Sequence, residues 1–225
     1  MAVNSEAIRK FLRVYFIMGS VNCQKDPEEV LLAAIRGGIS LFQFREKGNA
    51  CLQGEDKLQL AKKLQTICRN NQIPFIVNDD IELALEIDAD GVHIGQEDES
   101  ADIVRQKIGS KILGVSAHNL IEARKAIDDG ADYLGIGPIY PTSTKEDAKA
   151  VQGHSFLKEL RALDIQIPLV GIGGITAENA APIIGAGADG VSVITAISQA
   201  ESPEESARLL SIAVLNELNE LKNVH

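Results

Sequence analysis

The stretch D-A-D-G-V-H-I-G, residues 88–95, decides the fold because related copies of it recur later in the chain. The copies are G-A-D-Y-L-G-I-G at residues 130–137 and G-A-D-G-V-S-V-I at residues 187–194. Each copy has the form of a helix end that leads through Ala-Asp into a short apolar strand. The repeat therefore predicts a chain in which helices and strands alternate.

Short apolar runs extend this alternation along the whole chain. They predict eight strands, which are rich in β-branched residues and lie near residues 14–18, 39–44, 74–77, 91–94, 111–115, 133–136, 168–172 and 190–194. Helical periodicity lies between them, at residues 27–36, 52–71, 101–108, 120–129 and 203–221. Strands that are apolar throughout are typical of a parallel sheet covered on both faces.

The pattern predicts one α/β domain over residues 1–225, a (β/α)8 TIM barrel with a parallel eight-stranded core. Residues 1–13 form either a helix that closes the barrel base or an arm, and residues 203–221 form a C-terminal helix. The alternative is a doubly wound sheet, but the G-x-G-x-x-G fingerprint is missing after the first strand.

Composition limits the partners. A net charge of −10 and a pI near 4.9 exclude a broad surface for nucleic acid or for an anionic membrane. No apolar run is long enough to span a bilayer. The three cysteines lack C-x-x-C spacing, which favours ordinary thiols in a reducing compartment. We expect a cytoplasmic protein that binds small molecules, and a homo-oligomer is left open.

Polar residues that follow the strands are the candidates for a site, because barrels carry their active sites at the carboxyl ends of the strands. Gln43, Arg45 and Lys47 alternate after the second strand, so we expect all three on one side. Two cations at the barrel mouth indicate an anionic substrate. The alternative is a solvated strand end with an Arg–Glu pair.

The third strand ends in N-D-D, residues 78–80, and Asp98 lies four residues beyond the fourth. Neighbouring strand ends bring Asp79 and Asp98 close enough to share one Mg²⁺, which prefers one or two carboxylates together with phosphate oxygens. A helix N-cap is the alternative role for Asp79 or Asp80. We expect one of the two to cap, and Asp79, which is nearer the strand, to bind the metal.

Two histidines and a serine lie near the same strand ends. His93 is out of phase with its neighbours, so its side chain is expected to enter the lumen and contact a substrate ring. A hydrogen-bonded structural role is the alternative for His93 and for His118. Ser116 ends the fifth strand without a nucleophile elbow around it, so we assign it to binding.

A second anion site is expected near the last strands. The stretch P-T-S-T-K, residues 141–145, offers the hydroxyls of Thr142, Ser143 and Thr144 and the charge of Lys145. An exposed polar loop is the alternative. The seventh strand ends in G-G-I and the eighth in V-I-T-A-I, where barrels commonly bind phosphate through backbone N–H groups. We place a terminal phosphate near Gly174, Ile194 and Thr195.

Taken together, these motifs resemble those of the thiamine-phosphate synthase family. The collinear match runs from about residue 14 to residue 198 and consists of Q-F-R-E-K, N-D-D, G-V-H-I-G-Q-E-D, G-V-S-A-H, G-P-I-Y-P-T-S-T-K, G-G-I and V-S-V-I-T-A-I. The resemblance implies a transferase of thiamine biosynthesis. It would join 4-amino-2-methyl-5-(diphosphomethyl)pyrimidine (the pyrimidine diphosphate) to 4-methyl-5-(2-phosphoethyl)thiazole (the thiazole phosphate), giving thiamine phosphate and diphosphate.

The resemblance also implies roles for residues. The pyrimidine diphosphate is held by residues that match Gln43, Arg45, Lys47, Asn78, Ser116 and Lys145, with His93 added from the strand geometry. The thiazole phosphate is held by Thr142, Ser143, Thr144, Gly174, Ile194 and Thr195. Asp79 and Asp98 bind Mg²⁺. The catalytic residues are then Arg45, Lys47, Lys145 and Ser116, and a dissociative reaction needs no essential general base.

Two other functions compete with this one. A thiazole tautomerase on the same barrel would be an isomerase that uses a histidine, here His118, and needs neither diphosphate nor metal. A non-catalytic regulator would bind the thiazole phosphate and signal to a partner. The acid pair and the P-T-S-T-K loop favour the synthase. Other phosphate-binding barrels share only the G-G-I motif and the phosphate site of the eighth strand.

Overall fold

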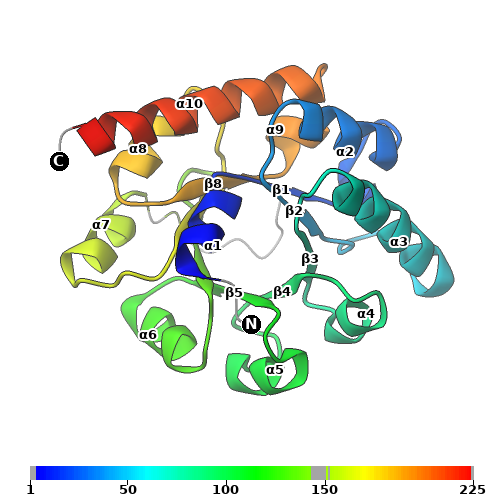
Figure 1. Cartoon of the computed structure of the whole chain (residues 1–225), viewed down its shortest axis with the longest axis horizontal. Helices are drawn as coiled ribbons and strands as arrows, with labels where there is room; N and C mark the ends of the chain where they lie inside the picture. Colours follow the sequence, from blue (N-terminus) through cyan, green and yellow to red (C-terminus); the bar gives the residue numbers. More distant parts are fainter. Residues whose placement is uncertain (1–3, 143–150, 152, 224–225) are drawn as a thin grey trace.

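The protein is described by a computed structural model over residues 4–142, 151 and 153–223. Eight parallel strands close in chain order into a barrel, and helices surround it (Figure 1). The strands are β1 Val14–Met18, β2 Leu41–Phe44, β3 Phe75–Asn78, β4 Gly91–Ile94, β5 Ile112–Ala117, β6 Tyr133–Ile136, β7 Leu169–Ile172 and β8 Gly190–Val193. The predicted (β/α)8 barrel is confirmed.

The five helices predicted from periodicity are present with small shifts at their ends, and the structure adds others that were not predicted. Their bounds are α1 Ser5–Phe11, α2 Pro27–Arg36, α3 Gly54–Asn70, α4 Ile81–Glu86, α5 Ala101–Ile108, α6 Leu120–Asp128, α7 Ser155–Ala162, α8 Ala181–Gly185, α9 Thr195–Ser198 and α10 Pro203–Asn223, with a 3-10 turn at Ser20–Asn22. Local chemistry sets these ends. Asp26 accepts backbone hydrogen bonds at 2.9 and 3.2 Å from the first turn of α2, which begins with Pro27.

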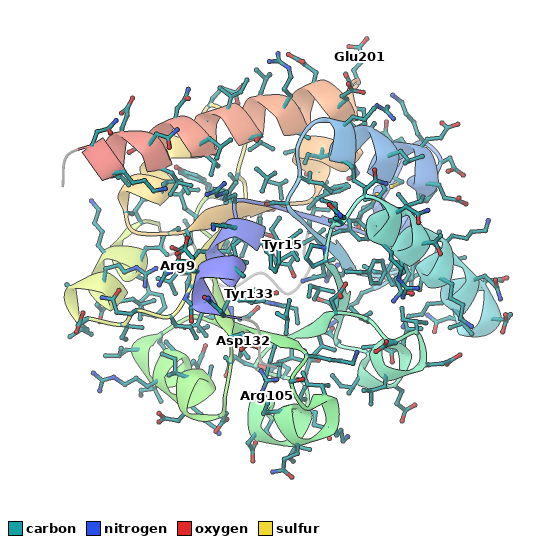
Figure 2. All side chains as sticks on the ribbon, in the orientation of Figure 1. Arg9, Tyr15, Arg105, Asp132, Tyr133 and Glu201 are labelled. Carbon is teal, nitrogen blue, oxygen red and sulfur yellow. The ribbon has the colours of Figure 1, made fainter. Side chains whose placement is uncertain are left out.

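The core has two layers because side chains alternate across each strand. On β1, Tyr15 and Ile17 point into the lumen, whereas Phe16 and Met18 pack outward against the helices. The lumen cluster is filled mainly by branched aliphatic residues and two tyrosines, and Figure 2 shows Tyr15 and Tyr133 inside the ring of strands. A filled lumen leaves only the two ends of the barrel available for binding.

The N-terminal segment forms a helix that closes one end of the barrel. Ile8 on α1 and Leu12 just after it are buried and pack against the lumen cluster. Figure 1 shows α1 lying across the ring of strands. Because α1 leads directly into the start of β1, it covers the amino end of the strands and leaves the carboxyl end for the site.

The aspartate of the sequence repeat has a defined structural role. In each copy its carboxylate accepts the backbone N–H of a residue at or next to the start of the preceding strand. The three bonds are each 2.8 Å long and join Asp90 to Phe75, Asp132 to Leu113 and Asp189 to Leu169. The repeat therefore ties β3 to β4, β5 to β6 and β7 to β8, and it stabilises the amino end of the barrel.

Two of these aspartates also hold an arginine from the helix that precedes the earlier strand of the pair. Arg105 on α5 donates to Asp132 at 2.7 Å, and Arg161 on α7 donates to Asp189 at 2.9 Å. Each arginine also donates through Nε to the carbonyl of the glycine that opens the same repeat copy. Figure 2 shows Arg105 beside Asp132. The two arrangements are structural equivalents, as the sequence repeat indicates.

The C-terminal helix packs on the outside of the barrel. Figure 1 shows α10 running along α2 and α8. A Cβ at Gly37 would lie 2.3 Å from the carbonyl oxygen of Glu204, so this glycine allows the close approach of α10 to α2. The predicted C-terminal helix is confirmed as a cover over neighbouring helices.

Candidate active site

A cavity of about 480 Å³ opens at the carboxyl ends of the strands. Its wall combines polar side chains that follow β2 to β5 with glycine-rich backbone that follows β7 and β8. The predicted site residues that line it are Arg45, Lys47, Asn78, Asp79, His93, Asp98, Ser116, Thr142, Gly174, Ile194 and Thr195. Residues from separate strands are thus brought together at one rim.

Arg45 is the most informative cation in the cavity wall. The residue is only 8 % exposed, and its guanidinium has no ion pair or hydrogen bond among the residues that the structure describes. The alternative Arg–Glu pair is wrong, because Glu46 bonds elsewhere. An arginine keeps its charge at any physiological pH and has five donors in a planar fork. A nearly buried guanidinium with no counter-ion in the described part of the chain is therefore well placed to bind an anion.

Lys47 lies at the more open part of the rim. Its ammonium is 2.7 Å from a carboxylate oxygen of Asp79. The hydrogen bond with Asp79 raises the pKa of Lys47, so the ammonium stays charged. The side chain is half exposed, at 49 %, and can move toward a ligand in the cavity.

The acid pair lies beside these cations. Asp79 adopts φ 61°, a conformation that aspartate tolerates better than most residues and that places it after the end of β3. Asp98 accepts the N–H of Gly95 at 2.7 Å. Burial, and next the neighbouring carboxylate of Asp79, raises the pKa of Asp98 although the Gly95 N–H opposes the change. The two carboxylates face one another across strand ends.

Asp80 takes the capping role. Its side chain accepts the N–H of Leu83 at 3.0 Å, in the first turn of α4, and pairs with Lys57 at 2.6 Å. The expectation that one aspartate of the N-D-D motif caps a helix is confirmed. The other aspartate, Asp79, lies in the cavity.

The donor set fits a hard divalent cation. Among the described residues, no group of three or more His, Cys, Asp or Glu side chains is arranged to hold a metal. The pair of Asp79 and Asp98 instead matches the one or two carboxylates that Mg²⁺ takes when substrate phosphate oxygens complete its coordination. Burial first, and the nearby Asp79 carboxylate second, raise the pKa of Asp98, and a cation between the two carboxylates would offset both effects.

A chain of hydrogen bonds crosses the lumen below the cavity. The amide of Gln43 donates to the hydroxyl of Tyr15 at 2.5 Å, and the Tyr15 and Tyr133 hydroxyls are 2.8 Å apart. His93 Nδ1 lies 3.0 Å from the Tyr133 hydroxyl, and His93 Nε2 lies 3.0 Å from Ser116 Oγ. We name these five residues the lumen chain.

The direction of donation follows from the first link of the lumen chain. Because the Tyr15 oxygen accepts from Gln43, donation from Tyr15 to Tyr133 and from Tyr133 to His93 Nδ1 is the arrangement that gives both buried hydroxyl protons an acceptor within the lumen chain. His93 then carries its proton on Nε2 and donates it to Ser116. The Ser116 hydroxyl is left to donate into the cavity.

Gln43 lies deeper than the alternation of residues 43, 45 and 47 indicates. Its residue is 1 % exposed, and it is not among the residues that line the cavity. The barrel wall covers it, and its amide bonds to Tyr15. The structure therefore brings Arg45 and Lys47 to the cavity and places Gln43 one side-chain layer below them.

The glycine-rich end of the cavity follows β7 and β8. Gly173 and Gly174 have φ of 103° and 63°. A Cβ at Gly174 would lie 2.5 Å from the carbonyl oxygen of Pro141, so no other residue fits there without a shift. Ile194 and Thr195 follow at the start of α9. Thr142 lines the cavity, while Ser143, Thr144 and Lys145 lie outside the described residues.

His118 directly follows β5 and lies at the cavity wall. Its Nδ1 is 2.9 Å from Glu122 Oε2, one helical turn further along the chain. The alternative of a hydrogen-bonded role is observed for both histidines, and both also line the cavity, so contact of His93 with a substrate ring stays a prediction.

Glu46 is a residue that the strand pattern does not single out. It is 8 % exposed and accepts three hydrogen bonds, from the Ser20 N–H at 2.7 Å, the Ser20 hydroxyl at 2.5 Å and the Leu52 N–H at 2.8 Å. Glu46 thus fixes the loop that carries Arg45 and Lys47. The one feature of the sequence that pointed to Glu46 was its position between the two cations Arg45 and Lys47.

With the geometry established, comparisons with known proteins identify the family. The TMP-TENI family model, described as thiamine monophosphate synthase, matches residues 14–197. A thiamine-phosphate synthase from Bacillus cereus (strain B4264) is 59% identical over 216 residues, which are 96% of this chain and 99% of that protein. The chain belongs to the thiamine-phosphate synthase family.

Two further relatives agree with this assignment. A thiamine-phosphate synthase from Bacillus thuringiensis (strain Al Hakam) is 61% identical over 208 residues, 92% of this chain and 95% of that protein. A solved structure of thiamine phosphate pyrophosphorylase from Pyrococcus furiosus superimposes with a TM-score of 0.84 at 32% identity, covering 94% of this chain and 99% of that one.

The expected enzyme class is confirmed at this identity and coverage. The chain is a transferase of thiamine biosynthesis that condenses the two heterocyclic phosphates into thiamine phosphate and diphosphate. Within the described part of the chain, none of the helices has the length and apolar character needed to cross a membrane.

Proposed function

We propose that this thiamine-phosphate synthase is Mg²⁺-dependent and that the cavity at the carboxyl ends of the strands performs the condensation. The observation that carries the proposal is the unpaired Arg45 guanidinium beside the acid pair of Asp79 and Asp98. A site with a free cation and two facing carboxylates suits a diphosphate with a divalent ion. Such a site has no use in a reaction of the thiazole phosphate alone, because that substrate brings no diphosphate.

Asp79 and Asp98 would hold the Mg²⁺. The chemistry that Mg²⁺ supplies here is neutralisation of negative charge on the diphosphate oxygens. Arg45 adds two or more charge-assisted hydrogen bonds to the same oxygens, and Lys47 adds a point charge. Asn78 and Ser116 line the same part of the wall and contribute neutral donors. Lys145, outside the described residues, stays a predicted fourth contact.

The remaining chemistry is alignment. The pyrimidine enters the lumen side of the cavity, where His93 and Ser116 lie, and the phosphate of the thiazole binds the backbone that follows β7 and β8. Departure of diphosphate leaves a methylene cation that the aminopyrimidine stabilises, and the thiazole nitrogen attacks it. Both nitrogens of His93 are engaged in the lumen chain, so the step uses positioned charges and no essential base.

The test is a direct assay with matched variants. The purified chain is mixed with both substrates and Mg²⁺, and thiamine phosphate and diphosphate are measured. An isomerase or a regulator would release no diphosphate. Arg45→Ala should lower kcat/KM by about a hundredfold or more, the usual loss for one preorganised contact. Lys63→Ala is the control, because Lys63 pairs with Glu28 on the surface, is 60 % exposed and does not line the cavity. Equal activities of the two variants would refute the proposal.

We also propose a cytoplasmic location. Cys23, Cys51 and Cys68 are all free thiols, which suits a reducing compartment. Fractionation of cells followed by detection of the chain tests this location.

A further inference from the structure

Ser192 on β8 has an unexplained buried hydroxyl. The residue is 2 % exposed, and its Oγ has no hydrogen-bond partner among the residues that the structure describes. Burial of a polar atom without a partner is unfavourable, and such atoms are rare in folded proteins. Ser192 is part of the cavity wall, and its register partner Tyr15 belongs to the lumen cluster. An unpaired hydroxyl buried in the wall of a substrate cavity is suited to bond a ligand that fills the cavity.

The position of Ser192 indicates which part of a ligand it meets. It lies on β8 two residues before Ile194, which follows the strand, and it is opposite Tyr15 on β1 and Ile172 on β7. Ile194 and Thr195 carry the backbone expected to bind phosphate, so Ser192 lies one side-chain layer below that anion site. A ligand whose anionic group binds at the rim would place its uncharged ring at that depth.

The two rings of the proposed reaction differ in what they offer to a hydroxyl. The aminopyrimidine has ring nitrogens that accept hydrogen bonds and an amino group that donates one. The thiazole ring nitrogen is the attacking atom, and a hydrogen bond to it would occupy the electron pair that forms the new bond. A serine hydroxyl both donates and accepts. It can therefore bind the aminopyrimidine without opposing the reaction.

We infer that Ser192 is a recognition residue that binds the polar edge of the aminopyrimidine ring; this inference rests on the proposed function. His93, Ser116 and Gly135 line the same cavity. Gly135 has no side chain, and a Cβ there would lie 3.2 Å from His93 Cε1. Ser192 on β8 thus adds a hydrogen bond to the aminopyrimidine ring, beside the contacts of His93 on β4 and Ser116 on β5.

Ser192→Ala tests the inference because the variant should bind the pyrimidine diphosphate more weakly without becoming less stable to unfolding. The KM for the pyrimidine diphosphate should rise roughly threefold to tenfold, the loss expected for one neutral hydrogen bond. The KM for the thiazole phosphate should not change. The midpoint of thermal unfolding should equal that of the wild type or exceed it by up to about 4 °C, since an unpaired buried hydroxyl is removed.

Ser198→Ala is the matched control. Ser198 is also 2 % exposed and its Oγ also lacks a partner in the described structure, but it does not line the cavity. Loss of the Ser198 hydroxyl should leave the KM values for the pyrimidine diphosphate and the thiazole phosphate unchanged, and it should not lower the midpoint of thermal unfolding.

Three results would overturn the inference: an unchanged KM for the pyrimidine diphosphate, a rise in the KM for the thiazole phosphate alone, or a fall in the unfolding midpoint of Ser192→Ala. The wild-type assay separates this failure from failure of the proposed function. If the wild type releases diphosphate from both substrates and Ser192→Ala behaves like it, only the inference about Ser192 is wrong. If the wild type releases none, the proposed function itself fails.

Discussion

Replacement of Asp189 by alanine should destabilise the barrel more than any exposed charge deletion. The Asp189 side chain is 15 % exposed and accepts from Arg161 at 2.9 Å, from the N–H of Leu169 at 2.8 Å and from Arg9 on α1. It therefore joins α1, α7 and the β7–β8 pair at the amino end of the barrel. Burial lowers the pKa of Arg161, and Asp189 opposes this change.

The magnitude follows from what the alanine leaves behind. Asp189→Ala leaves a partly buried guanidinium and a strand N–H without an acceptor. Removal of one partner of a buried ion pair costs about 3–5 kcal/mol. At about 2–4 °C per kcal/mol for a chain of this length, the unfolding midpoint should fall by roughly 6–20 °C.

The assay is thermal unfolding followed by circular dichroism, with Glu205→Ala as control. Glu205 pairs with Arg208 on exposed α10, with side chains 50 % and 53 % exposed. Exposed pairs contribute about 0–1 kcal/mol. If both variants unfold within about 2 °C of each other, the role assigned to the repeat aspartate is refuted.

Other variants test the site and the thiols. Tyr133→Phe removes the proton that fixes His93, so ¹⁵N NMR should show a mixture of tautomers; an unchanged Nε2–H form would contradict the lumen chain. Glu46→Ala leaves three hydrogen-bond donors unpaired. Its free energy of unfolding, measured with denaturant, should fall by about 3 kcal/mol or more, and its KM for the pyrimidine diphosphate should rise. A wild-type free energy of unfolding together with a wild-type KM would contradict this role of Glu46. Burial, then Asp26 and Glu46, raises the pKa of Cys23 to about 12. At pH 8, a disulfide reagent should modify Cys23 roughly a thousandfold more slowly than free cysteine. The same reagent should not reach the buried Cys68 until the protein unfolds. Fast labelling of both thiols in the folded protein would contradict their observed burial.

The fold was predictable because its signal is periodic and local. The Ala-Asp repeat and the apolar runs place all eight strands, and short-range chemistry such as the Asp26 cap places the helix ends. The function of the repeat aspartate was not predictable in the same way. Its partners Leu169 and Arg161 lie 20 and 28 residues away in sequence, and the pairing of β7 with β8 brings them together.

The site was predictable where a residue directly follows a strand. Arg45, Asp79 and Asp98 reach the rim because all parallel strands end at the same edge. The depth of Gln43 was not predictable, since it depends on the stagger between neighbouring strands. The lumen chain joins residues from β1, β2, β4, β5 and β6, and no spacing in the sequence encodes those contacts.

The central claim is that Asp79, Asp98 and Arg45 together bind a diphosphate with a divalent ion. Calorimetric titration of diphosphate into the protein, with and without Mg²⁺, tests it most directly. We expect tight binding only with Mg²⁺, loss of that dependence in Asp98→Asn, and weak binding under both conditions in Arg45→Ala. Equal affinity with and without Mg²⁺ in the wild type, or wild-type behaviour of Asp98→Asn, would contradict the claim.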